Sequence, residues 1–183
     1  MSGAIAGRER RYDPFQHAID LDVEVSEVLI PGDTLGLLYL DAHGSAQRIE
    51  IDRRSLQREN RATVAHELAH LDVHAQTGSW GNGPDEPRHQ VEDQCDRIAA
   101  ERLIDVHELV EAAKWADSIE ELADELNVDS GMVLARIASL QGKDASRFER
   151  AAGQLFRAGG VGEPSGSTLK RRKGLGNRVQ LPW

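Results

Sequence analysis

The sequence predicts an α+β fold in which a small N-terminal antiparallel sheet packs on a mostly helical body. Two observations predict this fold class. Between residues 23 and 52, apolar and β-branched residues alternate or cluster in three short segments separated by turn residues. Between residues 55 and 140, apolar residues recur at helical spacing in five segments. With 183 residues, 39% hydrophobic and 29% charged, the chain is long enough for one domain with its own core.

The N-terminal part is expected to form one short helix and then the sheet. A helix is expected from Asp13 to about Leu21, because Phe15, Ala18 and Ile19 share one side of it. The segments that follow are rich in Val, Ile, Leu and Tyr, as strands are. Strands are therefore expected at residues 23–30, 35–40 and 48–52, with a turn at residues 31–33 and a hairpin-like loop at residues 41–45.

The remaining segments are expected to be helical. The longest of them starts with Ser55 or Asn60 as its cap, and Ser118 with Glu121 resembles a capping box. A loop with three glycines and two prolines separates the two longest helices. Helices are expected from residue 55 or 60 to 75, and over residues 88–104, 108–113, 118–126 and 132–140.

Charge divides the chain into an acidic body and a basic end. The net charge is −15 over residues 1–140 and +6 over residues 141–183, which gives −9 for the chain. We expect a flexible lead-in at residues 1–12, one domain at residues 13–140, and a basic, largely disordered tail at residues 141–183. An acidic body disfavours nucleic acid as a partner, so direct binding is expected only weakly, through the tail.

Other features of the sequence indicate a cytoplasmic protein without a membrane segment. No stretch is apolar over the length of a membrane span, and the first residues contain no apolar signal region. The only cysteine, Cys95, excludes an internal disulfide and a cysteine-rich zinc site. Cys95 lies on the same apolar stripe as Val91 and Ile98, so we interpret it as a small core residue.

The strongest chemical signal is the motif HExxH at residues 66–70. On a helix, His66 and His70 share one face, so both imidazoles can reach one metal ion. Zinc lowers the pKa of a bound water towards neutrality, and Glu67 can then accept its proton. The motif predicts one catalytic zinc ion with Glu67 as the general base. The alternative is that two surface histidines lie one turn apart by chance.

A catalytic zinc usually has three protein ligands, so one more must come from elsewhere. Glu92 is the best candidate, because it lies 22 residues after His70, beyond a loop that lets the next helix turn back. Asp96 follows one turn later on the same face and can accept a hydrogen bond from a ligating imidazole. The alternative for Glu92 is an exposed helix carboxylate.

Other histidines are weaker candidates for the third ligand. His74 is two turns from His66, a helix rise of about 12 Å, which is too far for one ion. We interpret it as a residue of the helix end. His89 can compete with Glu92, but we expect it to face solvent or substrate, and Asp93 to lie on the surface. No glycine turn follows the motif, so a third histidine of the metzincin type is not expected.

These segments resemble the ImmA/IrrE family of metallo-endopeptidases. The resemblance is carried by AHELAH at residues 65–70, by EDQCDRIAA at residues 92–100, and loosely by residues 118–140. It covers roughly residues 13–140. It implies a zincin-like domain in which His66, His70 and Glu92 bind zinc and Glu67 is the base. Cys95 and Ile98 depart from the usual Ala and Phe, which affects packing and leaves the metal ligands in place.

The resemblance also implies a biological role. Members of the family cleave transcriptional repressors, often of the helix-turn-helix type, and thereby switch on prophage, mobile-element or stress genes. One alternative is a non-catalytic protein-binding regulator with a structural or vestigial zinc site. Another is a DNA-binding regulator that uses residues 119–140 as a helix-turn-helix, although four acidic residues in the first helix would repel phosphate.

Overall fold

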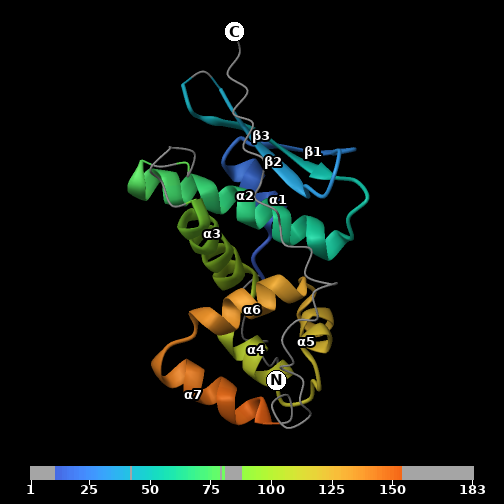
Figure 1. Cartoon of the computed structure of the whole chain (residues 1–183), viewed down its shortest axis with the longest axis vertical. Coiled ribbons are helices and arrows are strands. Elements are labelled where there is room, and N and C mark those ends of the chain that lie inside the picture. The colour runs from blue at the N-terminus through green and yellow to red at the C-terminus, as the bar shows by residue number, and fades with distance from the viewer. Residues whose placement is uncertain (1–10, 42, 79, 81–87, 154–183) are drawn as a thin grey trace, which may run out of the picture.

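The computed structural model describes residues 11–41, 43–78, 80 and 88–153. Within them the chain forms one three-stranded sheet and seven helices (Figure 1). The α+β class predicted from the sequence is confirmed. The elements are α1 (Pro14–Asp20), β1 (Glu24–Val28), β2 (Gly36–Leu40), β3 (Ala46–Asp52), α2 (Gln57–Thr77), α3 (Arg88–Leu103), α4 (Val106–Ala112), α5 (Ile119–Leu126), α6 (Ser130–Ser139) and α7 (Gly142–Ala151).

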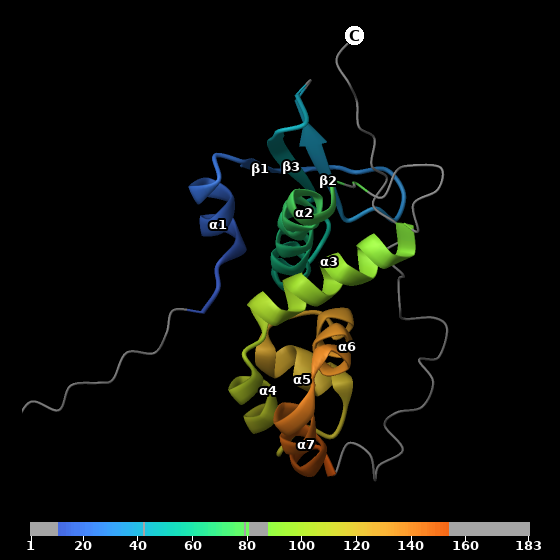
Figure 2. The ribbon, with the colours of Figure 1, turned by 90° about the vertical axis from the view of Figure 1, so that its left-hand side faces the viewer.

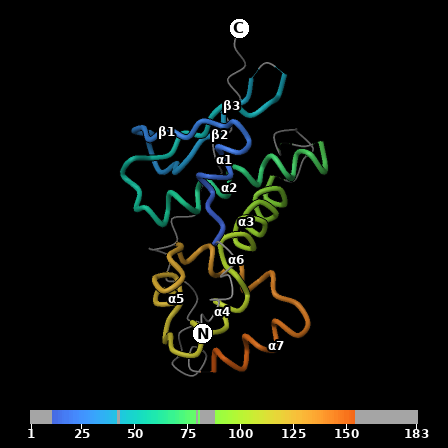
Figure 3. Tube along the Cα trace, turned by 180° about the vertical axis from the view of Figure 1, so that it is seen from behind, coloured from blue at the N-terminus to red at the C-terminus, as the bar shows by residue number. Residues whose placement is uncertain are grey.

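The long helix α2 lies at the centre of the arrangement. The sheet covers it from one side, and Figure 2, in which α2 is seen nearly end-on, shows α3 crossing on the opposite side. From behind, α3 runs obliquely from α2 down to the helices α4, α5, α6 and α7 (Figure 3). Helix α2 therefore lies between the sheet and α3, and α3 connects it to the C-terminal helices.

The sheet is mixed, so the prediction of an antiparallel sheet was wrong in one of its two pairings. The strand order is β1-β3-β2, with β3 in the middle. β2 and β3 form the expected antiparallel hairpin, whereas β1 pairs in parallel with β3. The apolar pattern of a strand reports which face is buried and does not report which strand lies beside it.

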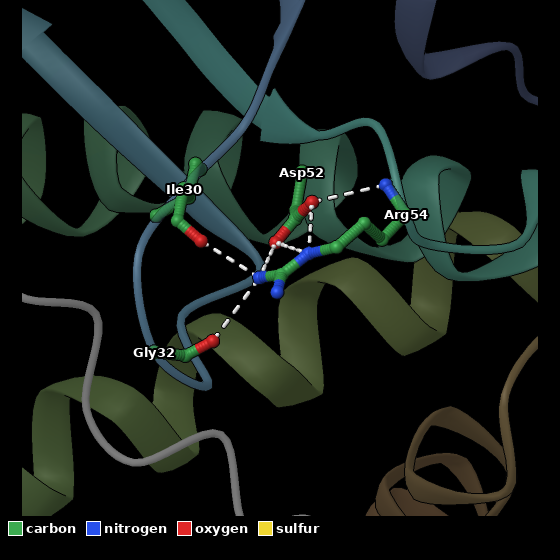
Figure 4. A network of polar contacts seen from close by, with 4 residues as sticks. All are labelled: Ile30, Gly32, Asp52 and Arg54. Atoms are coloured by element: carbon green, nitrogen blue, oxygen red, sulfur yellow. Dashed lines mark hydrogen bonds and ion pairs between the residues drawn. The ribbon is translucent and has the colours of Figure 1, made fainter.

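An ion pair between the buried Asp52 and the exposed Arg54 joins the loop after β1 to the end of β3 (Figure 4). The carboxylate of Asp52 is almost fully buried and accepts hydrogen bonds from the guanidinium and the backbone N–H of Arg54. The same guanidinium donates to the backbone oxygens of Ile30 and Gly32, at 2.7 and 3.1 Å. Arg54 thus supplies hydrogen-bond donors to two backbone oxygens of the β1–β2 connection. This connection passes the end of β3, which lies between the two strands.

Most helix starts follow the sequence signals. The side chains of Asp13, Asp105, Ser118 and Asp129 accept backbone hydrogen bonds at the starts of α1, α4, α5 and α6. The expected cap of α2, Ser55 or Asn60, was wrong. Leu56 is the cap residue, and its backbone N–H donates to the Glu59 carboxylate at 2.8 Å.

Three apolar clusters hold the elements together. One lies between α1, the sheet and α2, and contains Ile49, Ile51 and Leu68. The largest fills the space between α2, α3 and the four C-terminal helices. A small third cluster lies where α2 crosses α3 and consists of Ala69, Val73, Val91, Cys95 and the partly buried Ile98. Small residues at this crossing let the two helix backbones approach closely.

Helix α7 occupies the first part of the segment predicted to be a disordered tail. Its Phe148 is 3% exposed and packs in the largest cluster, as does Ala152 just after the helix. The basic and glycine-rich composition of residues 141–183 concealed this one amphipathic helix. The rest of the predicted tail, like residues 1–10 of the predicted lead-in, lies outside the described residues. Among the described helices, none is both long and apolar enough to span a membrane.

Candidate metal centre

The HExxH motif lies in the middle of α2, where the helix is covered on both sides. Val64 and Leu68 face the sheet, and Ala65 and Ala69 face the other two clusters. His66 and His70 are 2% exposed and Glu67 is fully buried. Burying three polar side chains costs free energy unless they have a partner or a function.

The side chains of His66 and His70 meet Glu92 from α3. The distance from Oε2 of Glu92 to Nε2 of His66 is 3.3 Å, and to Nε2 of His70 it is 3.9 Å. One donor atom from each residue lies within 4.8 Å of the others. The structure therefore brings together the three residues that the sequence predicts as ligands.

The other nitrogen of each imidazole also has a partner on α3. Nδ1 of His66 lies 2.7 Å from Oδ1 of Asp96, the contact expected from the ExxxD spacing. Nδ1 of His70 lies 3.4 Å from Sγ of Cys95, a contact that the sequence analysis did not anticipate. Partners of this kind fix which ring nitrogen carries the proton and hold the ring orientation.

The protonation states of the cluster suit a metal site. Burial, together with the neighbouring His66, lowers the pKa of His70 from 6.5 to about 4. Burial raises the pKa of Glu92, but the hydrogen bond and charge of His66, with the charges of His70 and Arg88, outweigh it and place the pKa below its ordinary value. Near neutral pH, His70 is neutral and Glu92 ionised, the forms that bind metal.

The donor set fits zinc. Bonds of about 2.0–2.1 Å in a tetrahedron place neighbouring ligand atoms about 3.3 Å apart, close to the separation of Nε2 of His66 and Oε2 of Glu92. Nε2 of His70 is buried and has no hydrogen-bond partner within the part of the chain that the structure describes. A metal ion would satisfy this atom. Two imidazoles and one carboxylate are a common ligand set of catalytic zinc, with a fourth position for water.

Strand β2 closes the site on the side of Glu67. A Cβ atom on Gly36 would lie 2.3 Å from Cγ2 of Thr63 and 3.1 Å from Oε1 of Glu67. Because glycine has no Cβ, the start of β2 can lie directly against the side chains of Thr63 and Glu67. A glycine at the start of an apolar strand gave no sequence signal for this contact.

The weaker candidates lie where the sequence analysis placed them. His74 is in the last turn of α2, and its ring stacks on Trp80 with the centroids 3.9 Å apart. This stacking holds Trp80 against the last turn of α2. His89 and Asp93 are exposed on α3. Cys95 is buried on the apolar stripe as expected, and burial raises the pKa of its thiol.

The possible helix-turn-helix corresponds to α5 and α6. Helix α6 packs against α3, and its Met132 and Val133 are buried there. Helix α5 presents Glu120, Glu121 and Glu125 to solvent. The pair therefore forms part of the helical core with an acidic outer surface.

In a comparison with protein families, residues 19–138 match the IrrE N-terminal-like domain (Peptidase_M78). Searches of curated proteins and of solved structures gave no significant match. The matched segment begins in α1 and ends in α6, so it contains α2 and α3 complete. The resemblance seen in the sequence is thus confirmed over well over half of the chain. The protein belongs to the IrrE N-terminal-like domain family of metallopeptidases.

Proposed function

We propose that this protein is a zinc-dependent endopeptidase that cleaves a transcriptional repressor of the helix-turn-helix type and so derepresses prophage, mobile-element or stress genes. The observation that carries the proposal is the convergence of His66, His70 and Glu92 within 4.8 Å on two crossing helices. Glu67 lies between the two histidines in the chain, and a purely structural zinc site would need no general base there. Family membership supports a peptide substrate, and the family resemblance supports a repressor.

Each residue has a defined role in this mechanism. His66, His70 and Glu92 would hold one zinc ion, which when bound would polarise a carbonyl group and acidify water. Asp96 accepts a hydrogen bond from Nδ1 of His66, which places the ring proton on Nδ1 and leaves the Nε2 lone pair as the one that would bind the metal. The Glu67 carboxylate accepts a proton from the attacking water and delivers it to the amine nitrogen of the leaving peptide.

The test is co-expression with the repressor-like protein encoded nearest to this chain. Wild type is compared with Glu67→Gln, which keeps the size of the side chain and removes the base. Glu101→Gln is the matched control, because Glu101 is an exposed carboxylate on α3. Loss of the intact partner is expected with wild type and with Glu101→Gln only. Zinc content is measured in all three proteins and is expected to be equal.

Two outcomes would contradict the proposal. Cleavage by Glu67→Gln would remove the general base from the mechanism. An intact partner in all three strains, together with a stable complex, would favour the non-catalytic regulator with a structural or vestigial zinc site. A purified repressor mixed with zinc-loaded protein then shows whether cleavage needs a further factor of the cell.

A further inference from the structure

We propose that Cys95 is a positioning residue of the metal centre: its sulfur accepts a hydrogen bond from Nδ1–H of His70 and thereby keeps Nε2 of that ring free to bind the metal. The inference rests on the proposed function only in that the site binds a metal ion. It assigns the single thiol of the chain a role in metal affinity, in addition to its packing in the core.

The first support is the geometry of α3. Glu92, Cys95 and Asp96 are at positions i, i+3 and i+4, so they share one face of the helix. That face meets both histidines of α2. Glu92 approaches the Nε2 atoms of both rings, Asp96 approaches Nδ1 of His66, and Cys95 approaches Nδ1 of His70. One helix face thus supplies a ligand and a partner atom for each imidazole.

The second support is the direction of the hydrogen bond. The pair at 3.4 Å has two possible arrangements, depending on whether the thiol or the imidazole donates. If the thiol donated to Nδ1, the ring proton would lie on Nε2, the atom that faces Glu92. Metal binding at Nε2 requires the opposite arrangement, in which Nδ1–H donates and a sulfur lone pair accepts.

The third support is the enclosure of the contact. Cys95 and His70 are 0% and 2% exposed, so water has little access to replace the sulfur as acceptor. The surrounding residues Ala69, Val73 and Val91 are aliphatic and offer no polar side-chain atom. Without the sulfur, Nδ1–H of His70 would be buried in apolar surroundings, and the ring would be less firmly oriented.

The experiment compares zinc affinity, measured by competition with a chromophoric chelator, in four full-length proteins. Cys95→Ala removes the acceptor and is expected to weaken zinc binding about tenfold, the lower end of the effect of losing an outer-shell partner. Cys95→Ser keeps an acceptor atom and is expected to stay within about threefold of wild type. Val73→Ala is the packing control, because Val73 is fully buried in the same cluster and touches no ligand through a hydrogen bond.

Two further measurements separate positioning from packing. Unfolding by urea without metal reports the loss of packing, which is expected for both alanine variants. The visible absorption of the cobalt(II)-substituted proteins reports ligand geometry, and its band is expected to shift in Cys95→Ala and to remain unchanged in Val73→Ala.

The outcomes distinguish this inference from the proposed function. Weaker binding in Cys95→Ala, restored in Cys95→Ser and absent in Val73→Ala, supports it. Equal affinity in wild type and Cys95→Ala overturns it and leaves the zinc site in place. Equal weakening in Cys95→Ala and Val73→Ala, or no recovery with serine, assigns the effect to packing and also overturns it. Absence of zinc binding in wild type itself overturns both proposals.

Discussion

Replacing Gly36 with alanine tests how closely β2 packs against the helix that carries the HExxH motif. The new Cβ would lie 2.3 Å from Cγ2 of Thr63, whereas carbon atoms in contact prefer about 3.5–4.0 Å. Strand, helix and the Thr63 methyl group must therefore separate by roughly 1 Å in total. Overpacking of a tight core costs about 1–3 kcal/mol. The separation also moves Glu67, whose Oε1 would be 3.1 Å from the added atom.

The expected result of Gly36→Ala is a free energy of unfolding lower by about 1–3 kcal/mol, measured in urea on the metal-free protein. Peptide cleavage is expected to fall through kcat more than through KM, because the displaced group is the proposed base. Zinc affinity is expected to change little, since the three atoms nearest to the added Cβ belong to Thr63, Glu67 and Glu50 and to none of the three ligands.

Thr63→Ser provides the matched rescue, because it deletes Cγ2 and keeps the hydroxyl. In a double-mutant cycle, the two substitutions are expected to be less destabilising together than the sum of the single variants. Cleavage is expected to recover only in part, because the contact with Glu67 remains. Two results together would contradict close packing of β2 on α2. These are strictly additive changes in the free energy of unfolding and a free energy of unfolding of Gly36→Ala equal to that of wild type.

Three further results are expected. Glu92→Ala is expected to lose zinc, as measured by metal analysis of the purified protein; unchanged stoichiometry would place the third ligand elsewhere. The hydrogen bonds from Arg54 hold the pKa of Asp52 below its usual value. The ionised carboxylate therefore stabilises the fold above the unfolded-state pKa of about 3.9. This contribution is lost as the pH falls through the folded-state pKa. Asp52→Asn is accordingly expected to lower the free energy of unfolding most at neutral pH, with the difference from wild type shrinking below pH 4; a difference independent of pH would contradict the ion pair. Leu109→Ala, at a fully buried position, is expected to cost about 2–5 kcal/mol in urea, and Trp115→Ala, at a position 82% exposed, less than about 0.5 kcal/mol.

The parts of the fold that the sequence predicted are those with a local signal. The helices α1, α3 and α5 follow from apolar spacing and from caps such as Asp13 and Ser118. The parallel pairing of β1 with β3 depends on which strand inserts between two others, and no local pattern encodes that choice. Helix α7 was missed because its one large apolar residue, Phe148, is surrounded by charged residues.

The site divides in the same way. The approach of Glu92 and Asp96 to the two histidines was predictable, because their spacing on one helix face is the one that a metal ligand and its carboxylate partner would need. The contact of Cys95 with His70 had a weaker signal, its position three residues after Glu92, which places it on the same face. The approach of Gly36 to Glu67 had none, since a missing side chain does not reveal what lies opposite it.

The crossing of α2 and α3 has a consequence for how metal supply and folding are linked. The two histidines belong to α2 and Glu92 to α3, so an ion bound by all three would be a reversible cross-link between the two helices. At a free zinc concentration 100 times the dissociation constant, such a cross-link adds about 2.7 kcal/mol to the stability of the folded chain. Removal of the ion would thus lower the free energy of unfolding by the same amount, so metal supply would set the stability of the fold as well as the occupancy of the site.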